Sequence, residues 1–464
     1  MSVFSKILLV YMILLTGMLN VAMVCAQLDE TPSVQQDGAL KNLPERNEQF
    51  MDWGLGMFVH WSLDSQLGSV ISHSMVGASD DYLDRYINDL PSTFNPKRYD
   101  PNEWASIAKM AGVKYMVFTT KHHSGFCMWD TATTDFNIMN TPYGKDVVRG
   151  YVDACRKHGI KVGFYFSPED FLFLRRRGKL IRRRGLESTA EDRAALDALN
   201  VKQIEELFTN YGDIDVAFLD GGGKEAPMRR IHELQPKCIV TRGEMSTPEQ
   251  KLPGGPQPGP WESCFTLGTQ WQYKPTNEDY KTGTQLINML IETRAKGGNL
   301  LINVGPDPHG VIPFEQERVF RELGLWMFIN REGIHDIRPC PVIGERDGIW
   351  YVQARDGKSV YVFLTQFTGE NQWKRKERKE VVLTKLRATS ETAISVLSQN
   401  DLVVEYSPEK DATSRFKQTE AGLEISVMRA QRIYNNSSWP NTIVVKLDNV
   451  DFAGQPLKNK SPLE

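Results

Sequence analysis

The chain has 464 residues, of which 41% are hydrophobic and 24% charged, and its formal net charge at pH 7 is −3. These values are typical of a globular protein. The small net charge argues against nucleic acid as a partner, because phosphate binding needs a strongly basic face. The length suits one large barrel followed by a smaller domain.

The N-terminal segment has the layout of a secretion signal. Lys6 precedes the apolar run 7–24, and small residues lead to a cleavage site expected after Ala26. We therefore expect residues 1–26 to be a signal peptide and the mature protein to be exported, either periplasmic or secreted. The run is also long enough to serve as an uncleaved anchor, which would be the only contact with a membrane.

Short apolar runs alternate with amphipathic helices between residues 50 and 335. Strands are expected at 54–61, 115–121, 161–167, 215–221, 238–243 and 299–306. Their nearly continuous apolar character is typical of parallel strands buried on both faces. Helices are expected at 100–112, 145–159, 193–210 and 284–296. This repeated βα pattern predicts a (β/α)8-like, TIM-type barrel over residues 27–340.

The pattern changes at residue 341. Short strands separated by turn signals are expected at 348–355, 359–367, 380–386, 392–398, 402–407, 423–427 and 442–448. They predict a C-terminal β-sandwich domain over residues 341–464. The five cysteines after residue 26 include no C-x-x-C pair, so we expect mostly buried thiols.

Two adjacent histidines, His122 and His123, end the second predicted strand. They are candidates for metal ligands, for catalytic bases, for hydrogen-bond donors to a substrate or for buried structural polar groups. Neighbouring side chains of a strand point to opposite faces, and the sequence offers no third ligand at a suitable spacing. We therefore expect no metal ion and no cofactor.

Asp220 is the leading candidate for a catalytic carboxylate. It closes the fourth predicted strand, and the three glycines that follow leave room for a ligand near the backbone. Asp-Gly is also ordinary turn chemistry. Glycoside hydrolysis needs a second carboxyl group, about 5–5.5 Å away for retention or about 6.5–9.5 Å for inversion. The downstream candidates are Glu244, Glu249 and Glu262.

Specific motifs occur in order over roughly residues 45–340: GLGMFVHWS, AKMAGVKYMVFTTKHHSGFCMWDT, VGFYFSPEDF, IDVAFLDGG, TRGEMSTPEQ, PWESC, GTQWQY and AKGGNLLINVGPDPHG. This set resembles the α-L-fucosidases of glycoside hydrolase family 29. The resemblance implies a retaining exo-α-L-fucosidase, a barrel with a C-terminal β-sandwich, and a fucosylated oligosaccharide or polysaccharide as substrate.

The resemblance also assigns roles to residues of this chain. It implies that Asp220 is the nucleophile and that Glu249 is the acid/base, with Glu262 as the alternative. It implies a fucose pocket formed by His60, His122, His123, Tyr165, Arg242 and Trp271. We also expect Trp61 to contact the sugar, because it is an aromatic side chain at a strand end and the C–H faces of sugars stack on such rings.

Some positions depart from the family pattern. Ser124 stands where many relatives have Asp, and Phe218 where they have Trp or Tyr. GASDDYLDRY, 77–86, replaces a Glu-Trp-Tyr stretch, with Asp80 and Asp81 as candidates to replace its glutamate. Two alternatives follow, namely a hydrolase of a related L-sugar such as an α-L-galactoside and a non-catalytic fucose-binding protein.

One charged segment is not explained by the family pattern. LRRRGKLIRRRG, 174–185, carries seven basic side chains. One interpretation is a solvated loop. The other is that Arg175, Arg176, Arg182 and Arg183 recruit a decorated, anionic glycan, since guanidinium groups bind sulfate and carboxylate in a bidentate manner. The sequence allows a homo-oligomer.

Overall fold

The computed structural model describes residues 41–182, 189–345, 348–368, 371–434 and 439–453. The predicted signal peptide and Arg183 lie outside the described residues. Within these ranges, no helix is long and apolar enough to cross a membrane.

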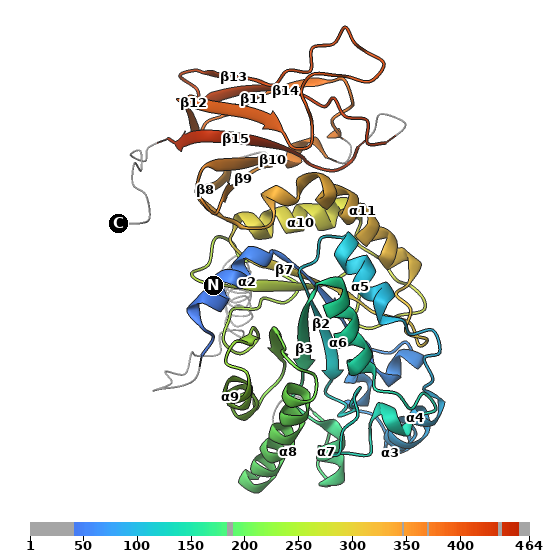
Figure 1. Cartoon of the computed structure of the whole chain (residues 1–464). Coiled ribbons are helices and arrows are strands. Elements are labelled where there is room, and N and C mark those ends of the chain that lie inside the picture. Colours follow the sequence, from blue (N-terminus) through green and yellow to red (C-terminus); the bar gives the residue numbers. More distant parts are fainter. Residues whose placement is uncertain (1–40, 183–188, 346–347, 369–370, 435–438, 454–464) are drawn as a thin grey trace, which may run out of the picture. The chain divides into compact units, whose positions relative to one another are not determined.

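A seven-stranded parallel sheet in the order β5-β4-β3-β2-β1-β7-β6 lies at the centre of the larger, N-terminal part of the fold (Figure 1). This TIM-like sheet confirms the predicted fold class. Each strand predicted between residues 54 and 306 has a counterpart in this sheet, whereas β6 was not predicted because its residues are too polar for an apolar run. The strands are β1 (Leu55–Val59), β2 (Tyr115–Lys121), β3 (Lys161–Phe166), β4 (Val216–Leu219), β5 (Ile239–Val240), β6 (Glu262–Thr266) and β7 (Asn299–Val304).

Helices flank the sheet, and their ends follow local capping rules. In α6, the Asp146 side chain accepts a hydrogen bond from the N–H of Arg149, and Gly159 ends the helix in the left-handed region. Thr189 and Asp192 form a capping box at the start of α8. The longer helices are α2 (Pro44–Trp53), α5 (Pro101–Met110), α6 (Val147–His158), α8 (Ala190–Thr209), α9 (Glu225–Leu234), α10 (Gly283–Ala295) and α11 (Phe314–Asn330).

The segment after β5 runs between the two edge strands of the sheet. β5 and β6 are not hydrogen-bonded to each other as strands. Single parallel bridges instead join Ser246 to Trp261 and Glu249 to Cys264. This path brings Glu249 beside β6, although β6 comes later in the chain.

The sheet has one apolar cluster on its inner face and another on its outer face. The inner cluster includes Phe58, Tyr165 and Phe218, and Trp271 packs against it. The outer and larger cluster fills the space between the strands and the helices.

Short helices follow the carboxyl ends of β1 and β3, and Figure 1 shows them at the end of the sheet toward which β2 and β3 run. They are α3 (Asp80–Asp84), α4 (Leu90–Thr93) and α7 (Phe171–Arg176).

The C-terminal part contains two antiparallel sheets, as predicted. One has the order β12-β15-β10-β9-β8 and the other β11-β14-β13. β8 pairs with β9 and begins at Ile337, before the predicted domain boundary. The strands are β8 (Ile337–Glu345), β9 (Ile349–Ala354), β10 (Ser359–Leu364), β11 (Arg378–Leu383), β12 (Leu386–Val396), β13 (Arg415–Gln418), β14 (Leu423–Met428) and β15 (Ile443–Phe452).

The strand predicted at 402–407 is wrong. This segment forms turns, because Asp401 and Tyr406 adopt φ values of 55° and 57° that bend the chain at both ends. The prediction of buried thiols is confirmed for the five cysteines of the described residues, all of which are buried and unpaired.

Candidate active site

Asp220 lies directly after β4. Its Oδ2 accepts a hydrogen bond of 2.9 Å from the Tyr165 hydroxyl, and its Oδ1 accepts one of 2.9 Å from Nη1 of Arg242. Burial alone would raise the pKa of Asp220, but the charge of Arg242 and these bonds outweigh burial and hold the pKa well below its ordinary value. The carboxylate is therefore ionised and fixed in orientation, which suits a nucleophile.

Glu249 shares the guanidinium group of Arg242 with Asp220. Nη1 of Arg242 also donates to Oε2 of Glu249 at 3.1 Å, and Nε of Arg242 donates to Oγ1 of Thr247 at 3.1 Å. Two oxygens about 3 Å from one nitrogen lie within about 6 Å of each other, a range that includes the spacing of retaining carboxyl pairs. The Glu249 side chain is 45% exposed, so solvent and a leaving group can reach it.

His122 and His123 lie side by side, with ring centroids 4.2 Å apart. β2 ends just before them, so the alternation of strand side chains does not separate them. The His122 ring is parallel to that of Tyr165, with centroids 5.3 Å apart. Nε2 of His123 lies 3.6 Å from Oδ2 of Asp220. Both imidazoles therefore lie close to the candidate nucleophile.

His60 and Trp271 lie side by side on another side of the pocket around Asp220, and Asn303 contacts both residues. The two rings are 4.9 Å apart, Nδ1 of His60 lies 2.6 Å from Oδ1 of Asn303, and the Asn303 amide donates to the main-chain oxygen of Trp271 at 2.5 Å. Burial lowers the pKa of His60 to about 3, so its ring is neutral. Asn303 is absent from the predicted set, although a polar residue inside the apolar strand β7 was an available signal.

The loop after β1 is anchored by Asp64, which was also not predicted. Oδ2 of Asp64 accepts hydrogen bonds from the N–H of Ser72 at 2.7 Å and from the Tyr86 hydroxyl at 2.8 Å. Oγ of Ser72 lies 2.9 Å from Nδ1 of His122 and accepts a bond of 2.9 Å from the N–H of Ser124. Ser72 adopts a φ of 57°, a strained value for a residue with a side chain. This loop therefore orients His122.

The glycines after Asp220 make room for Glu169. A Cβ on Gly221 would lie 2.9 Å from Cδ of Glu169, and the φ of Gly221 is 103°. The N–H of Gly222 donates to Oε1 of Glu169 at 3.1 Å, and Oε2 of Glu169 lies 3.7 Å from Nδ1 of His123. The space attributed to a ligand in the sequence is therefore occupied here by a carboxylate.

Trp61 and Glu262 are not brought into the pocket. Trp61 is 0% exposed and stacks on Tyr99 in the outer core. Glu262 is also 0% exposed, and its Oε2 accepts a hydrogen bond of 2.7 Å from the Tyr115 hydroxyl. Neither side chain exposes surface that a ligand bound at Asp220 could touch.

Three other carboxylates considered in the sequence form ion pairs with neighbouring side chains. Glu244 pairs with a histidine of α9. Asp80 and Asp81, on α3, are 90% and 79% exposed and pair with Arg175 and Arg85. The expectation that Asp80 or Asp81 replaces the missing glutamate stays a prediction.

Glu262→Gln is expected to flatten the pH dependence of folding stability. Burial raises the pKa of Glu262 to about 7, above the ordinary value of 4.5. Between these values the unfolded chain releases a proton that the folded protein keeps, so stability falls as pH rises. The free energy of unfolding should fall by about 3 kcal/mol between these pH values. Thermal unfolding at pH 5 and pH 8 measures it; an equal change in wild type and variant would contradict the prediction.

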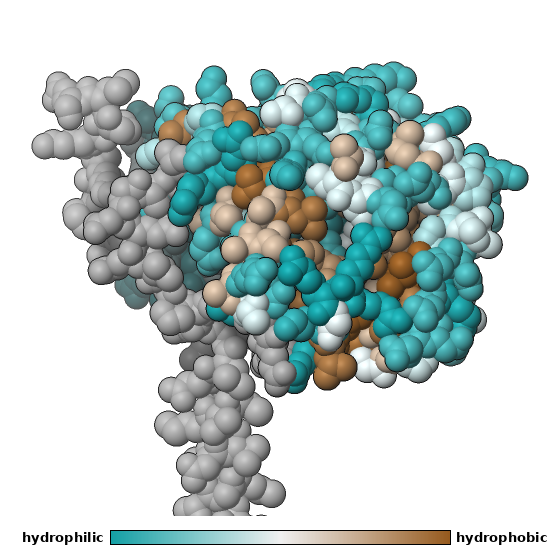
Figure 2. Space-filling view, turned by 90° about the horizontal axis from the view of Figure 1, so that it is seen from below, coloured by the Kyte–Doolittle hydropathy of each residue, from teal (hydrophilic) through white to brown (hydrophobic). Residues whose placement is uncertain are grey.

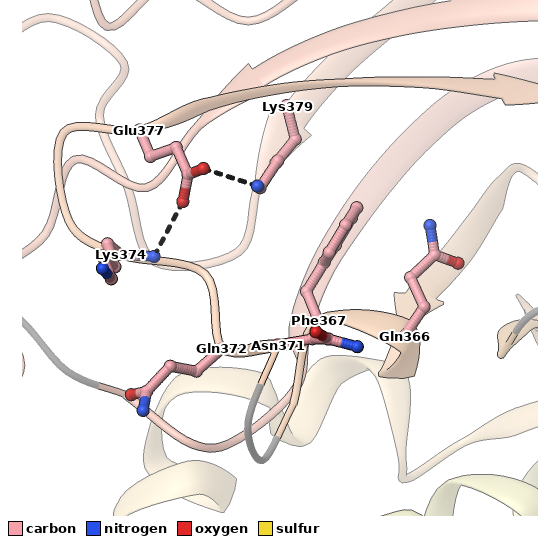
Figure 3. Close-up of a pocket in the computed structure, with 7 residues that line it drawn as sticks. All are labelled: Gln366, Phe367, Asn371, Gln372, Lys374, Glu377 and Lys379. Carbon is pink, nitrogen blue, oxygen red and sulfur yellow. Dashed lines mark hydrogen bonds and ion pairs between the residues drawn. The ribbon is translucent and has the colours of Figure 1, made fainter.

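The barrel face toward which β2 and β3 run is mostly hydrophilic, with apolar surface gathered inside it (Figure 2). A separate hollow lies on the C-terminal sheets, and Glu377, the one carboxylate among the described residues that line it, bonds to Lys379 and to the N–H of Lys374 (Figure 3). The described lining of this hollow therefore offers no carboxyl pair of the kind that glycoside hydrolysis needs. Its lining residues are Gln366, Phe367, Asn371, Gln372, Lys374, Glu377 and Lys379.

A family model described as alpha-L-fucosidase matches residues 21–332. The alpha-L-fucosidase of Dictyostelium discoideum is 28% identical over 304 residues, which are 60% of this chain and 64% of that protein. The plasma alpha-L-fucosidase of Rattus norvegicus is 28% identical over 309 residues, 60% of this chain and 65% of that protein. The matches thus span less than two thirds of either relative.

Solved structures share the fold. Alpha-L-fucosidase isoenzyme 1 from Paenibacillus thiaminolyticus is 27% identical, with a TM-score of 0.67 over 87% of this chain and 98% of that one. A GH29 alpha-L-fucosidase from Bacteroides thetaiotaomicron, described as a trapped covalent intermediate, is 21% identical, with a TM-score of 0.69 over 91% of this chain and 100% of that one. Because the family model matches most of the chain, this protein belongs to the alpha-L-fucosidase family, glycoside hydrolase family 29.

Proposed function

We propose that the protein is a retaining exo-α-L-fucosidase that removes terminal fucose from fucosylated glycans. The observation that carries the proposal is the bridge made by Arg242 between Asp220 and Glu249. The bridge holds two carboxylates close enough to act on one anomeric carbon, as the mechanism of a retaining glycosidase requires. The covalent intermediate named for the Bacteroides thetaiotaomicron relative supports the same chemistry.

The reaction would proceed in two displacements. Asp220 attacks the anomeric carbon while Glu249 gives its proton to the glycosidic oxygen, so the aglycone leaves as an alcohol and an ester to Asp220 remains. Glu249, now ionised, takes a proton from water as the water oxygen attacks the same carbon and releases Asp220. Because Arg242 and Tyr165 donate hydrogen bonds to Asp220, they keep it ionised and correctly aimed before the first displacement and stabilise it again as the leaving carboxylate of the second.

The histidines and Trp271 fit a role in sugar binding. His60, His122 and His123 are at most 5% exposed and converge beside Asp220, so they can offer ring nitrogens to hydroxyl groups. The Trp271 ring adds an apolar wall next to His60. A non-catalytic fucose-binding protein would not need the pair of Asp220 and Glu249, so the geometry favours an enzyme.

An anionic glycan as the preferred substrate finds less support. Arg175 bonds to Asp80 and Asp84 at 2.8 and 2.6 Å, and Arg176 bonds to Asp135 at 2.7 Å. A sulfate group would have to displace these aspartates. If this segment recruits anionic glycans, KM should be lower for sulfated than for neutral fucosylated glycans. This difference should disappear in the double variant Arg175→Gln/Arg176→Gln. Equal KM values for the two substrates in the wild type would reject recruitment of anions.

The proposed function predicts hydrolysis of p-nitrophenyl α-L-fucoside with α-L-fucose as the first product. We expect kcat/KM to be at least about 10-fold higher than for the matching α-L-galactoside, because an apolar wall penalises the extra hydroxyl group. Release of p-nitrophenol gives the rates, and NMR within the first minutes gives the anomer. A first product of β configuration would contradict retention, and a preference for the galactoside would support the related L-sugar.

A further inference from the structure

A third histidine, His73, joins His122 and His123 beside the candidate nucleophile. It begins the short 3-10 helix η2 (His73–Met75) in the loop after β1. Its ring centroid lies 5.9 Å from that of His122 and 5.4 Å from that of His123. One ring nitrogen from each of the three lies within 4.8 Å of the others. The expectation that no third ligand is available is therefore wrong, because the loop brings in a residue distant in sequence.

The neighbours of these rings suit metal ligation. In metal sites, a ligating imidazole is usually oriented by a hydrogen bond at its other nitrogen. Oγ of Ser72 lies 2.9 Å from Nδ1 of His122, and Oγ of Ser167 lies 2.6 Å from Nδ1 of His123. Because the Ser167 hydroxyl donates to the main-chain oxygen of Glu169, its oxygen accepts from Nδ1 of His123, which leaves Nε2 as the ligating nitrogen when the ring is neutral.

Asp220 lies next to one of the three rings. Nε2 of His123 lies 3.6 Å from Oδ2 of Asp220. Zinc bonds to nitrogen and oxygen are about 2 Å long, so one ion can bridge two atoms at this separation. Ligand nitrogens of a tetrahedral site lie about 3.3 Å apart, which the three rings reach by shifts of about 1 Å.

We propose that His73, His122 and His123 bind a divalent transition-metal ion of the Zn²⁺ class next to Asp220, and that the bound ion blocks the pocket. A donor set of three imidazoles matches the preference of Zn²⁺. The ion would neutralise the carboxylate that attacks the sugar and would occupy two sugar-binding imidazoles. Zn²⁺ is thus an inhibitor that competes with the glycoside, and no catalytic step uses it.

Metal binding is tested on the full-length protein without a polyhistidine tag after chelator treatment. Isothermal titration with Zn²⁺ should give one site, and Co²⁺ should give the visible absorption of a tetrahedral complex. His73→Gln should weaken Zn²⁺ binding at least about 10-fold. His158→Gln, at the end of α6, is the matched control and should bind as wild type does. Absence of saturable binding, or equal affinity in His73→Gln and wild type, would overturn the proposal.

Inhibition is tested separately, since only this readout rests on the proposed fucosidase activity. Zn²⁺ should raise the KM for p-nitrophenyl α-L-fucoside without changing kcat, and EDTA should reverse the effect. If the protein hydrolyses no fucoside, the titration and the Co²⁺ spectrum still decide the metal site. If Zn²⁺ binds at the histidines but leaves KM unchanged, blocking of the pocket is rejected. His122→Gln serves as a second ligand variant if His73→Gln unfolds, as judged by circular dichroism.

Discussion

Replacing Asp220 with glycine is expected to lower kcat for p-nitrophenyl α-L-fucoside by about 10⁴-fold or more, because the covalent step loses its nucleophile. Sodium azide should restore part of the turnover, since the small anion fits the space left by the carboxylate. Azide would then attack from the side of the lost carboxylate and form β-L-fucosyl azide. Product analysis by NMR and initial rates with and without azide measure both effects.

Glycine is preferred to asparagine at this position for a chemical reason. An asparagine at position 220 would precede Gly221, and Asn-Gly sequences deamidate readily to restore the carboxylate. Asp153→Asn, on the exposed side of α6, provides a control that changes the same charge far from the pocket. Retention of more than about a tenth of wild-type kcat by the glycine variant would remove Asp220 from the mechanism.

The neighbours of Asp220 could be predicted because they follow from strand topology. Tyr165 and Arg242 lie near the carboxyl ends of β3 and β5, on either side of β4 in the sheet. In a parallel sheet these ends meet at one edge, so three apolar runs in the sequence are enough to bring the side chains together. The hydrogen bonds from both residues to Asp220 agree with that expectation.

Trp61 illustrates a prediction that the sequence itself argued against. His60 and Trp61 are adjacent at the end of β1, and adjacent side chains of a strand point to opposite sides. His60 lies inside the pocket, so Trp61 faces the helices and packs in the outer core. Its aromatic character was given more weight than its position.

Loop residues could not be predicted, because loops carry no periodic pattern. His73 reaches the pocket through a loop in which Ser72 takes a φ of 57° and bonds to Asp64. No sequence spacing reveals that path. The choice between Glu249 and Glu262 depends in the same way on the segment after β5, whose bridge to β6 carries Glu249 to Arg242.

Glu249→Ala is expected to lower kcat by about 10²- to 10⁴-fold on a fucosylated oligosaccharide, whose leaving group needs a proton. The loss should be smaller for the first displacement on p-nitrophenyl α-L-fucoside, because nitrophenolate leaves without protonation. Azide should accelerate the second displacement and give α-L-fucosyl azide, the opposite anomer from that formed by the Asp220 variant. Steady-state rates on both substrates and NMR of the azide product measure these effects.

Glu249 also bonds to Arg242, so its removal could act through the position of that guanidinium group. Glu249→Gln separates the two effects, because the amide oxygen can still accept from Arg242 but the side chain has no acidic proton. A similar loss of kcat in the alanine and glutamine variants identifies proton transfer, whereas near-normal kcat in the glutamine variant identifies positioning. Glu262→Gln should keep most of its activity, because its carboxyl group is buried against Tyr115 away from Asp220. Azide rescue of Glu262→Ala together with near-normal turnover of Glu249→Ala would reverse the assignment.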